Sequence, residues 1–433
     1  MSSLISIVGG FLLALSFLNK KSHKILQLWL WLALLPNFLP VILVLLSTMS
    51  FFYWFGLSFQ GLWAIVFVHA LINMGLVAHN LYRSINHKAL ASLELVYVEG
   101  ASLRQWLWPV IKLLKDDILA SFIFVFFICF ASFSVPLILG NGLSTTLEVF
   151  IYEQIKIYKD WSTVSSLLII ELLALFILST LGWKQDYKAI KEIRETKLWN
   201  FNHYKFFLFL PLTIVLSGWM VESLRGWNEL YRLADYHSEI LSSIPWTIFI
   251  SLGVALLITG FLLLIAWVYP LKYLGKFLFG VGAPSTVLIG YSLVSWEFSN
   301  AYFSSALLII LALTLIFLPP LYRLYIATDF NDLHELVFMA ESLGASRKLI
   351  YSKIIIPILF PKIISCAQLA ALWACGEFAL SSIIADNSFS LALIIKDLLQ
   401  GYHLALAAIL MWVILFIGCA IYFLLTGVES VIS

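Results

Sequence analysis

Ionisable side chains inside apolar segments are the residues of this sequence most able to carry chemistry, because a charge in lipid is costly and usually functional. Glu377 lies in the apolar segment 359–385, directly before Phe378, and Glu171 lies in the segment 164–183. Glu377 either has a functional role of this kind or forms buried hydrogen bonds between helices. For Glu171 we expect the second, structural role.

The sequence lacks the patterns that membrane enzymes and ATPases need. It has neither a pair of intramembrane aspartates nor an H-E-x-x-H helix, and it has no G-x-x-x-x-G-K-[ST] loop. All four cysteines lie in apolar runs without metal-ligand spacing, so we interpret them as small core residues. We predict a protein that is not an enzyme and binds no metal or cofactor, with any ATP and Mg²⁺ used by a separate chain.

The elements that must position these residues are membrane helices. Of 433 residues, 62% are hydrophobic and only 12% charged, and the mean hydropathy is +0.98. The net charge of +2 gives no indication of a nucleic-acid partner. A spanning helix needs about 20 mostly apolar residues. Eleven segments qualify or nearly do: 3–18, 26–50, 61–81, 118–138, 164–183, 206–221, 243–268, 273–296, 302–322, 359–385 and 404–427.

The distribution of basic residues orients these segments. With the N-terminus outside, 21 of the 26 Lys and Arg residues fall on the cytoplasmic side. This asymmetry is typical of cytoplasmic loops. It predicts a multi-pass protein with a cytoplasmic C-terminus. The five basic residues left outside are Lys156, Lys159, Arg225, Arg232 and Lys396.

Several features recur at an offset of 244 residues. Pro40 and Pro284 are each followed 60 residues later by the same tripeptide. At nearly the same offset, Cys129 and Cys375 each shortly precede a phenylalanine. The tripeptides are Gly100-Ala101-Ser102 and Gly344-Ala345-Ser346. We predict two parallel, pseudo-symmetric halves, 1–200 with five spans and 201–433 with six. The first half is expected to lack an initial helix, and the basic stretch 184–204 is expected to join the halves in the cytoplasm.

Each tripeptide lies in a long cytoplasmic loop, at about 83–117 and about 323–358. In the second loop a helical stretch ends at Gly344, a second amphipathic stretch follows, and Pro357 suits the first turn of the next helix. A helix–glycine–helix elbow of this kind can present a rigid knob to a cytoplasmic partner. A plain connecting loop is the alternative, which the duplication disfavours.

The second loop resembles the EAA loop of binding-protein-dependent ABC importer permeases, through the spacing of Gly344, Ile354, Ile356 and Pro357. The glutamate that opens the family pattern is replaced by Phe338, whereas the first loop keeps it as Glu94 but has Lys112 and Leu113 in place of Leu-Pro. The resemblance implies that the loops dock on the ATPase, with unequal contacts. The implied coupling residues are Glu94, Gly100, Ala101, Ser102, Ala340, Gly344, Ala345, Ser346, Ile354 and Pro357.

The stretches 129–155 and 375–402 are similar to the fused permeases for thiamine and for ferric iron, with thiamine slightly favoured. The resemblance implies an all-α polytopic fold of the type I importer class in a bacterial inner membrane. It also implies an ATPase partner, in two copies, and a periplasmic binding protein. The implied pathway residues are Ser132, Ser134, Glu377 and Phe378. The alternative from another functional class is a secondary transporter. It is disfavoured because it needs no matched pair of cytoplasmic elbows.

Overall fold

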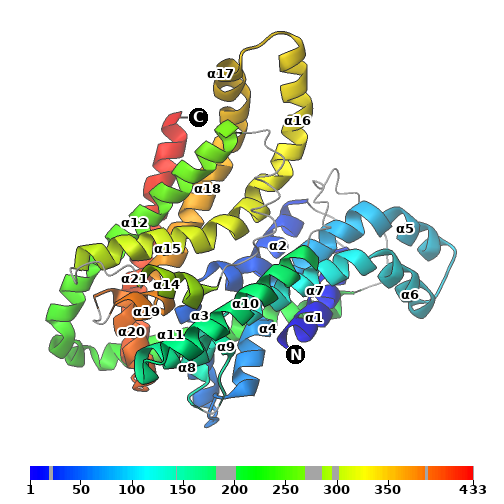
Figure 1. Cartoon of the computed structure of the whole chain (residues 1–433). Helices are drawn as coiled ribbons and strands as arrows, with labels where there is room; N and C mark the ends of the chain where they lie inside the picture. The colour runs from blue at the N-terminus through cyan, green and yellow to red at the C-terminus, as the bar shows by residue number, and fades with distance from the viewer. Residues whose placement is uncertain are drawn as a thin grey trace.

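The computed structural model describes residues 1–18, 23–142, 144–181, 201–268, 285–294, 302–385 and 389–432, and this part of the chain is helical without any strand (Figure 1). The N-terminal helices are α1 (Ser2–Phe17), α2 (His23–Phe38), α3 (Val41–Trp54), α4 (Leu62–Ser84), α5 (Leu90–Val98), α6 (Leu103–Leu113), α7 (Lys115–Phe130), α8 (Ser134–Leu139), α9 (Leu147–Glu153) and α10 (Trp161–Leu181). The C-terminal helices are α11 (Phe206–Asn228), α12 (His237–Val268), α14 (Thr286–Val294), α15 (Tyr302–Leu321), α16 (Ala327–Ser342), α17 (Arg347–Ile350), α18 (Ile356–Cys375), α19 (Ala379–Ile384), α20 (Leu391–Gln400) and α21 (Leu404–Ile432).

Short π-helical turns join several of these helices: η1 (Ile85–Ala89), η2 (Gln154–Tyr158), η5 (Tyr322–Ile326) and η6 (Tyr351–Ile355). Two 3₁₀ turns, η3 (Asn202–Lys205) and η4 (Leu230–Tyr236), precede α11 and α12.

Apolar helices long enough to cross a membrane dominate the described residues. Six pass by length and composition, or up to seven if a bent pair counts as one span. They match the predicted segments 61–81, 206–221, 243–268, 302–322, 359–385 and 404–427, with 26–50 as the bent pair. The chain is therefore an all-helical, polytopic membrane protein. The count of eleven stays a prediction, because α1 and the apolar part of α10 are shorter and 273–296 lies largely outside the described residues.

Three predicted spans are not continuous helices. The segment 26–50 bends by 91° between α2 and α3. Pro40 causes this bend, because it lacks an N–H and forces Leu39 out of the helical region. The segment 118–138 breaks after Phe130, and 359–385 breaks after Cys375. Both breaks are followed by a short helix, α8 or α19. Hydropathy averaged over a whole segment does not detect such breaks, because each is short and Glu377 is their one charged residue.

The order of helices repeats at the offset of 244 residues. α3, α4 and α5 correspond to α14, α15 and α16, and α7 through α10 correspond to α18 through α21. Their contacts repeat as well: α1 packs on α4 and α7, as α12 packs on α15 and α18. Across the repeat, α3 contacts α20 while α14 contacts α9. Helix α11 has no counterpart at this offset within the chain.

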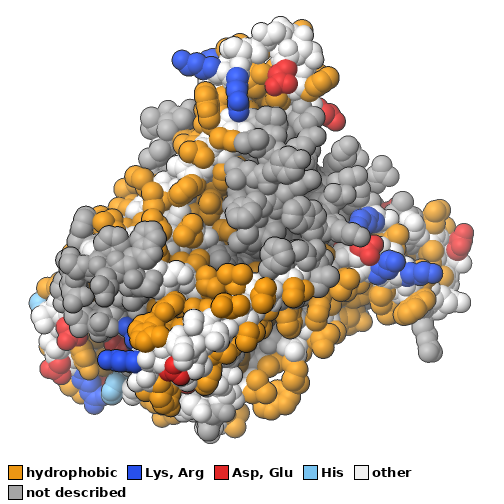
Figure 2. Space-filling model, viewed as in Figure 1, with side chains coloured by type: hydrophobic (Ala, Val, Ile, Leu, Met, Phe, Trp, Pro, Cys, Tyr) orange, Lys and Arg blue, Asp and Glu red, His pale blue; other side chains and the backbone are white. Residues whose placement is uncertain are grey.

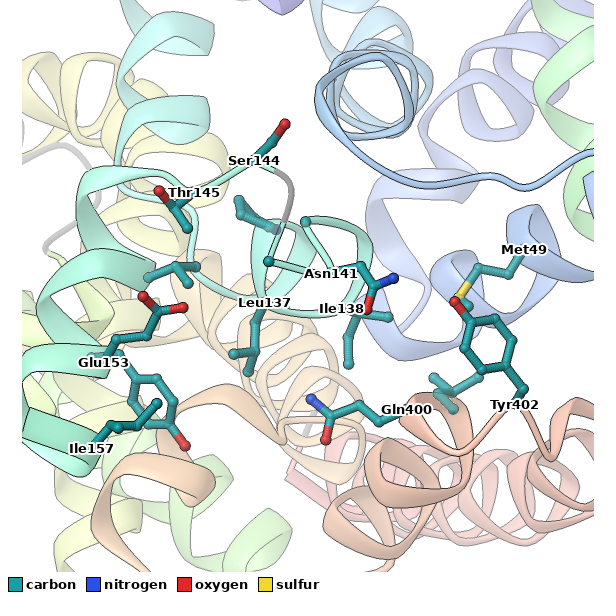
Figure 3. Close-up of a pocket in the computed structure, with 16 residues that line it drawn as sticks. Met49, Leu137, Ile138, Asn141, Ser144, Thr145, Glu153, Ile157, Gln400 and Tyr402 are labelled. Atoms are coloured by element: carbon teal, nitrogen blue, oxygen red, sulfur yellow. The ribbon is translucent and has the colours of Figure 1, made fainter.

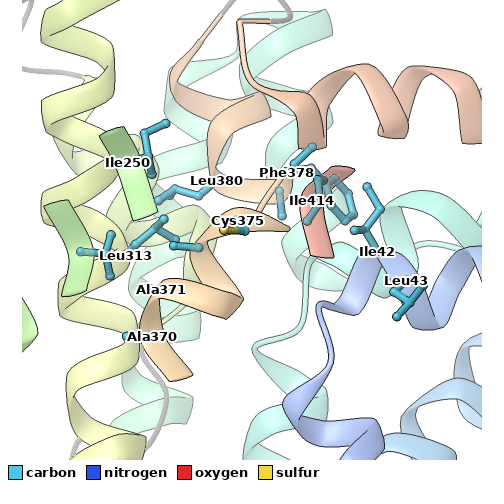
Figure 4. Close-up of a cluster of buried hydrophobic side chains, with 14 of the residues drawn as sticks. Ile42, Leu43, Ile250, Leu313, Ala370, Ala371, Cys375, Phe378, Leu380 and Ile414 are labelled. Atoms are coloured by element: carbon cyan, nitrogen blue, oxygen red, sulfur yellow. The ribbon is translucent and has the colours of Figure 1, made fainter. Parts of the chain in front are cut away.

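Most buried apolar side chains form one large cluster that draws on both ends of the chain. At its centre, Ile42 and Leu43 at the start of α3 lie beside Phe378 and Ile414 (Figure 4). A smaller cluster joins α1, α2, α4 and α6 around Trp106 and Phe201. The break between α18 and α19 is thus packed directly against the bend between α2 and α3.

Apolar side chains also cover much of the outer surface, as expected for a chain dissolved in lipid. Figure 2 shows orange side chains over much of the visible face, with charged ones gathered at the projecting ends. On α10, Ile169 and Leu172 are 61% and 53% exposed, and on α12 Leu256 is 71% exposed. The expected basic linker 184–204 lies mostly outside the described residues.

Candidate functional site

The Gly-Ala-Ser tripeptides form the same backbone turn in both places. Gly100 has φ +76° and Gly344 has φ +80°, a left-handed conformation that favours glycine. The N–H of Gly100 donates to the Tyr97 carbonyl at 3.0 Å, and that of Gly344 donates to the Glu341 carbonyl at 2.9 Å. Each glycine therefore ends one helix in a left-handed cap and directs the chain into the next helix.

The serine of each tripeptide begins the second helix. The Ser102 backbone N–H donates to the Gln105 side chain at 2.9 Å, which is half of a capping box. The Ser346 hydroxyl accepts a bond from the Leu349 N–H at 3.4 Å. The N–H of Ile350 donates to the Ser346 carbonyl at 3.0 Å. Local chemistry alone thus builds a helix–glycine–helix elbow at each tripeptide.

Both elbows project from the helical body, α5–α6 on one side and α16–α17 on another (Figure 1). Their tips carry exposed apolar side chains. Val98, two residues before Gly100, is 82% exposed, and Leu343, directly before Gly344, is 88% exposed. Nothing within 4 Å would meet a β-carbon on either glycine. Exposed apolar knobs on rigid turns are suited to docking in a groove of a partner protein.

The two elbows are held differently. In the first, Trp106 of α6 is 1% exposed and stacks on Phe201 with ring centroids 5.6 Å apart. In the second, the run from Arg347 continues through η6 into α18, forming one apolar helix as far as Cys375. It is tied to α12 by Arg347 Nη2, which donates to the Trp267 carbonyl at 3.0 Å.

The remaining residues expected to couple to a partner lie on these elbows. Glu94 is half-buried on α5, and Ala340 is half-buried near the end of α16. Ile354 lies in η6, and Pro357 occupies the first turn of α18 as expected, where it is exposed. The geometry brings these residues together as two separate elbows.

The expected pathway residues lie at the two helix breaks. Ser132 falls between α7 and α8, and Ser134 begins α8; both are half-buried. Glu377 does not lie within a spanning helix, as the sequence suggested, but in the turn between α18 and α19. Its Oε1 accepts a bond from the Leu380 N–H at 2.9 Å, so the carboxylate caps α19. Phe378 is 1% exposed and belongs to the large core, so its ring contributes packing there.

A cavity of about 300 Å³ lies between α8, α9 and the end of α20, and we call it the α8–α20 cavity. Figure 3 shows Glu153 at one end and Tyr402 and Met49 at the other. Asn141 and Gln400 line it between these ends. A second hollow of about 370 Å³ shares Met49 and Tyr402 with it. The lining combines a carboxylate, amides and aromatic rings, which can bind a small polar molecule.

Backbone strain is concentrated at this cavity. Among the described residues, three non-glycine residues have positive φ, and two of them, Asn141 (45°) and Tyr402 (59°), line the cavity. Such conformations persist where the surroundings impose them, often at functional sites. The Asn141 amide donates to Gln60 Oε1 at 2.7 Å, which fixes its orientation. Sequence reasoning missed this cavity. The signal available was the polar run after α8, Gly140 to Thr146.

The fold and these sites define a polytopic helical membrane protein with two matched elbows and a polar cavity between its N-terminal and C-terminal parts. The chain is similar to the thiamine transport system permease protein ThiP of Haemophilus influenzae, with 25% identity over 326 residues. The match covers 65% of this chain and 58% of that protein, so less than two thirds of the relative is represented. It confirms the resemblance of the chain to the permeases of ABC importers. No protein-family model and no solved structure matches the chain.

Proposed function

We propose that this chain is the membrane-spanning permease subunit of an ATP-driven importer. The observation that carries the proposal is the pair of elbows at Gly100 and Gly344, with the same turn, the same serine start and exposed apolar tips. A transporter driven by an ion gradient needs no duplicated docking device. The similarity to a transport permease supports the same class.

The partner at the elbows is a separate ATPase, which uses the ATP and Mg²⁺. Each elbow docks in a groove of one ATPase copy, so that closure of the ATPase moves α7 through α6, and α18 through η6. Because α17 and η6 run without interruption into α18, the second elbow transmits force along a single helix. The first elbow transmits it across the separate helices α6 and α7. The two contacts are therefore mechanically unequal.

We place the α8–α20 cavity on the outer side of the membrane. A binding protein on that side delivers the substrate. The lining suits an aromatic cation: Glu153 supplies a negative charge, while Tyr152 and Tyr402 supply ring faces. Thiamine has this chemistry, and the relative's name supports it. We therefore propose thiamine as the substrate, with α9 and α20 forming the first contact.

Reconstitution tests the proposal. The chain, its ATPase and its binding protein are placed in proteoliposomes, and uptake of labelled thiamine and of ferric iron is measured with and without ATP. ATP-dependent thiamine uptake is expected. ATP-dependent uptake of iron without uptake of thiamine would support an ATP-driven importer whose substrate is ferric iron and not thiamine. Uptake that needs an ion gradient and no ATPase would overturn the class.

A further inference from the structure

Two glutamates are completely buried together at the junction of the N-terminal and C-terminal parts of the chain. Glu148 lies in the first turn of α9 and Glu171 in the middle of α10, and each side chain is 0% exposed. Their carboxyl groups lie within hydrogen-bonding reach of each other. Among the described residues, neither carboxyl has a lysine or arginine partner.

One oxygen of this pair is satisfied from the opposite part of the chain. Glu148 Oε2 accepts a bond from the Val287 N–H at 3.1 Å, at the N-terminal end of α14. Ser285, which precedes α14, also bonds to the same carboxyl. A carboxylate is stabilised at a helix N-terminus by free N–H groups and by the helix dipole. Glu148 therefore links α9 to α14.

The other three oxygens lack any donor. Glu148 Oε1 and both oxygens of Glu171 are buried without a hydrogen-bond partner. Two ionised carboxylates cannot be held in contact in a low-dielectric interior, because each repels the other and both lose hydration. A single proton removes the repulsion and turns one of the facing oxygens into a donor to the other.

We propose that Glu148 and Glu171 form a proton-binding site in which the two carboxyl groups share one proton and hold α9 and α10 against the start of α14. A metal ion is a poorer fit, since the described residues contain no group of three or more acidic, His or Cys side chains that could hold one. The proton belongs to the pair and not to either residue.

The site exists in only one copy of the repeat. At the offset of 244 residues, Glu148 corresponds to Ala392 and Glu171 to Leu415. The second part of the chain builds the same contacts, α20 with α3 and α20 with α21, from apolar side chains. The fold therefore does not need the acidic pair, which points to a specific role for it.

That role follows from the position of α9. The same short helix lines the α8–α20 cavity through Val149, Tyr152 and Glu153. Loss of the shared proton would place a second negative charge in the buried site, and the repulsion between the two carboxylates would weaken the contact between α9 and α10. The wall of the cavity would then loosen as the pH rises. This inference concerns the protonation of Glu148 and Glu171. It does not depend on the proposed function or on the identity of the substrate.

Other titratable groups lie on the elements around the pair. Glu153 lines the cavity, and the Tyr291 ring of α14 packs on Trp161 at 5.5 Å. The groups that act on the Glu148 carboxyl are Glu171, Ser285 and the Val287 amide. The remaining titratable residues of α9, η2 and the packed helix α7 are Tyr152, Lys156, Tyr158, Lys115, Asp116, Asp117 and Cys129.

The direction of the pH effect follows from burial. Burial, and next the Glu171 carboxylate, raises the pKa of Glu148 well above its usual range, while the bonds from Ser285 and Val287 oppose this. A carboxyl whose pKa is raised by folding binds more protons in the folded state. Its contribution to stability is present at low pH and is lost as the pH rises through the folded-state pKa.

The experiment measures thermal unfolding of the purified chain in detergent from about pH 5 to about pH 8. Wild type should lose about 3 °C or more of Tm across this range. Glu171→Gln should lose much less, because the amide donates the hydrogen bond at every pH. Glu153→Gln, on the same helix but facing the cavity, is the matched control and should keep the wild-type slope.

Infrared spectroscopy provides a readout that survives poor folding of the variant. Wild type should show the C=O band of a protonated carboxyl at neutral pH, which vanishes at high pH and is absent from the Glu171→Gln spectrum. A wild-type spectrum without that band would overturn the proposal, as would equal pH slopes in wild type and Glu171→Gln. If Na⁺ or Mg²⁺ at high pH stabilised wild type but not Glu171→Gln, the proposal would be overturned, because the site would then be a metal-binding site and not a proton-binding site.

Discussion

Gly376 lies so close to Pro40 that a β-carbon on the glycine would stand 2.4 Å from the proline Cβ. The contact joins the break between α18 and α19 to the bend between α2 and α3, two irregular points from opposite ends of the chain. Both points leave backbone groups outside regular helices. Such backbone is tolerated at membrane depth only where protein buries it. The two breaks therefore cover each other.

Gly376→Val should destabilise the protein through this contact. The added methyl groups meet Pro40 and Ile42, which belong to rigid, buried structure. Overpacking of this kind costs about 1–3 kcal/mol, so we expect lower membrane abundance and a lower Tm in detergent. Gly260→Val on α12 is the control, since nothing lies within 4 Å of its β-carbon position. Equal Tm values for the two variants would contradict the close contact.

The elbow at Gly344 should distinguish substitutions by backbone conformation and not by size. Its φ of +80° and the open space around it mean that only the backbone is strained. Asparagine enters this conformation readily, whereas a β-branched residue costs about 1–2 kcal/mol there. We expect Gly344→Asn to co-purify with the ATPase and Gly344→Val to lose it, with equal membrane abundance. Normal co-purification of the valine variant with the ATPase would show that the elbow is not part of the docking surface.

Much of this elbow could be predicted from the sequence because its chemistry is local. A glycine at a helix end and a serine that starts the next helix are readable within a few residues, as Gly344 and Ser346 show. The offset of 244 residues was also visible, because Pro40 and the tripeptide at Gly100 recur as Pro284 and the tripeptide at Gly344. The bend at Pro40 was also predictable from the proline itself, which breaks a helix. Hydropathy alone does not take this property of proline into account.

The breaks and the buried acids could not be predicted in the same way. The break at Ser132 contains neither glycine nor proline, so only tertiary packing distinguishes it from a helix. The cavity depends on residues 261 positions apart, Asn141 and Tyr402, brought together by the fold. The pairing of Glu148 with Glu171 likewise appears only when α9 packs on α10.

Cysteine labelling tests the proposed orientation. Thr145 and Gln400 are exposed near the α8–α20 cavity, while Val98 and Leu343 are exposed on the elbows. In a background with the exposed Cys419 replaced, single cysteines at the first two positions should react with an impermeant reagent in intact cells. Those at the elbows should react only after the membrane is opened. Labelling at Val98 in intact cells would invert the topology.

Glu377 is the sharpest test of the pathway, because its structural and transport roles separate by substitution. The carboxylate accepts the Leu380 N–H and so caps α19. An amide oxygen in Glu377→Gln can accept the same bond, whereas Glu377→Ala removes it at a cost of about 1 kcal/mol. We expect the glutamine variant to assemble at normal abundance and to transport poorly, because a cationic substrate would lose its negative partner.

The measurement is ATP-dependent uptake at matched membrane abundance, for wild type, Glu377→Gln and Glu377→Ala. The alanine variant should show lower abundance in addition to lost uptake, since it loses the cap. Ser382→Ala, on the following helix, removes a hydroxyl bonded to the Ala379 carbonyl at 2.7 Å and serves as a nearby control for helix stability. Full uptake by Glu377→Gln would assign the carboxylate to capping alone, and reduced abundance of that variant would do the same. Because Gln preserves the cap and removes only the charge, lost uptake at normal abundance would place a negative charge in the transport pathway.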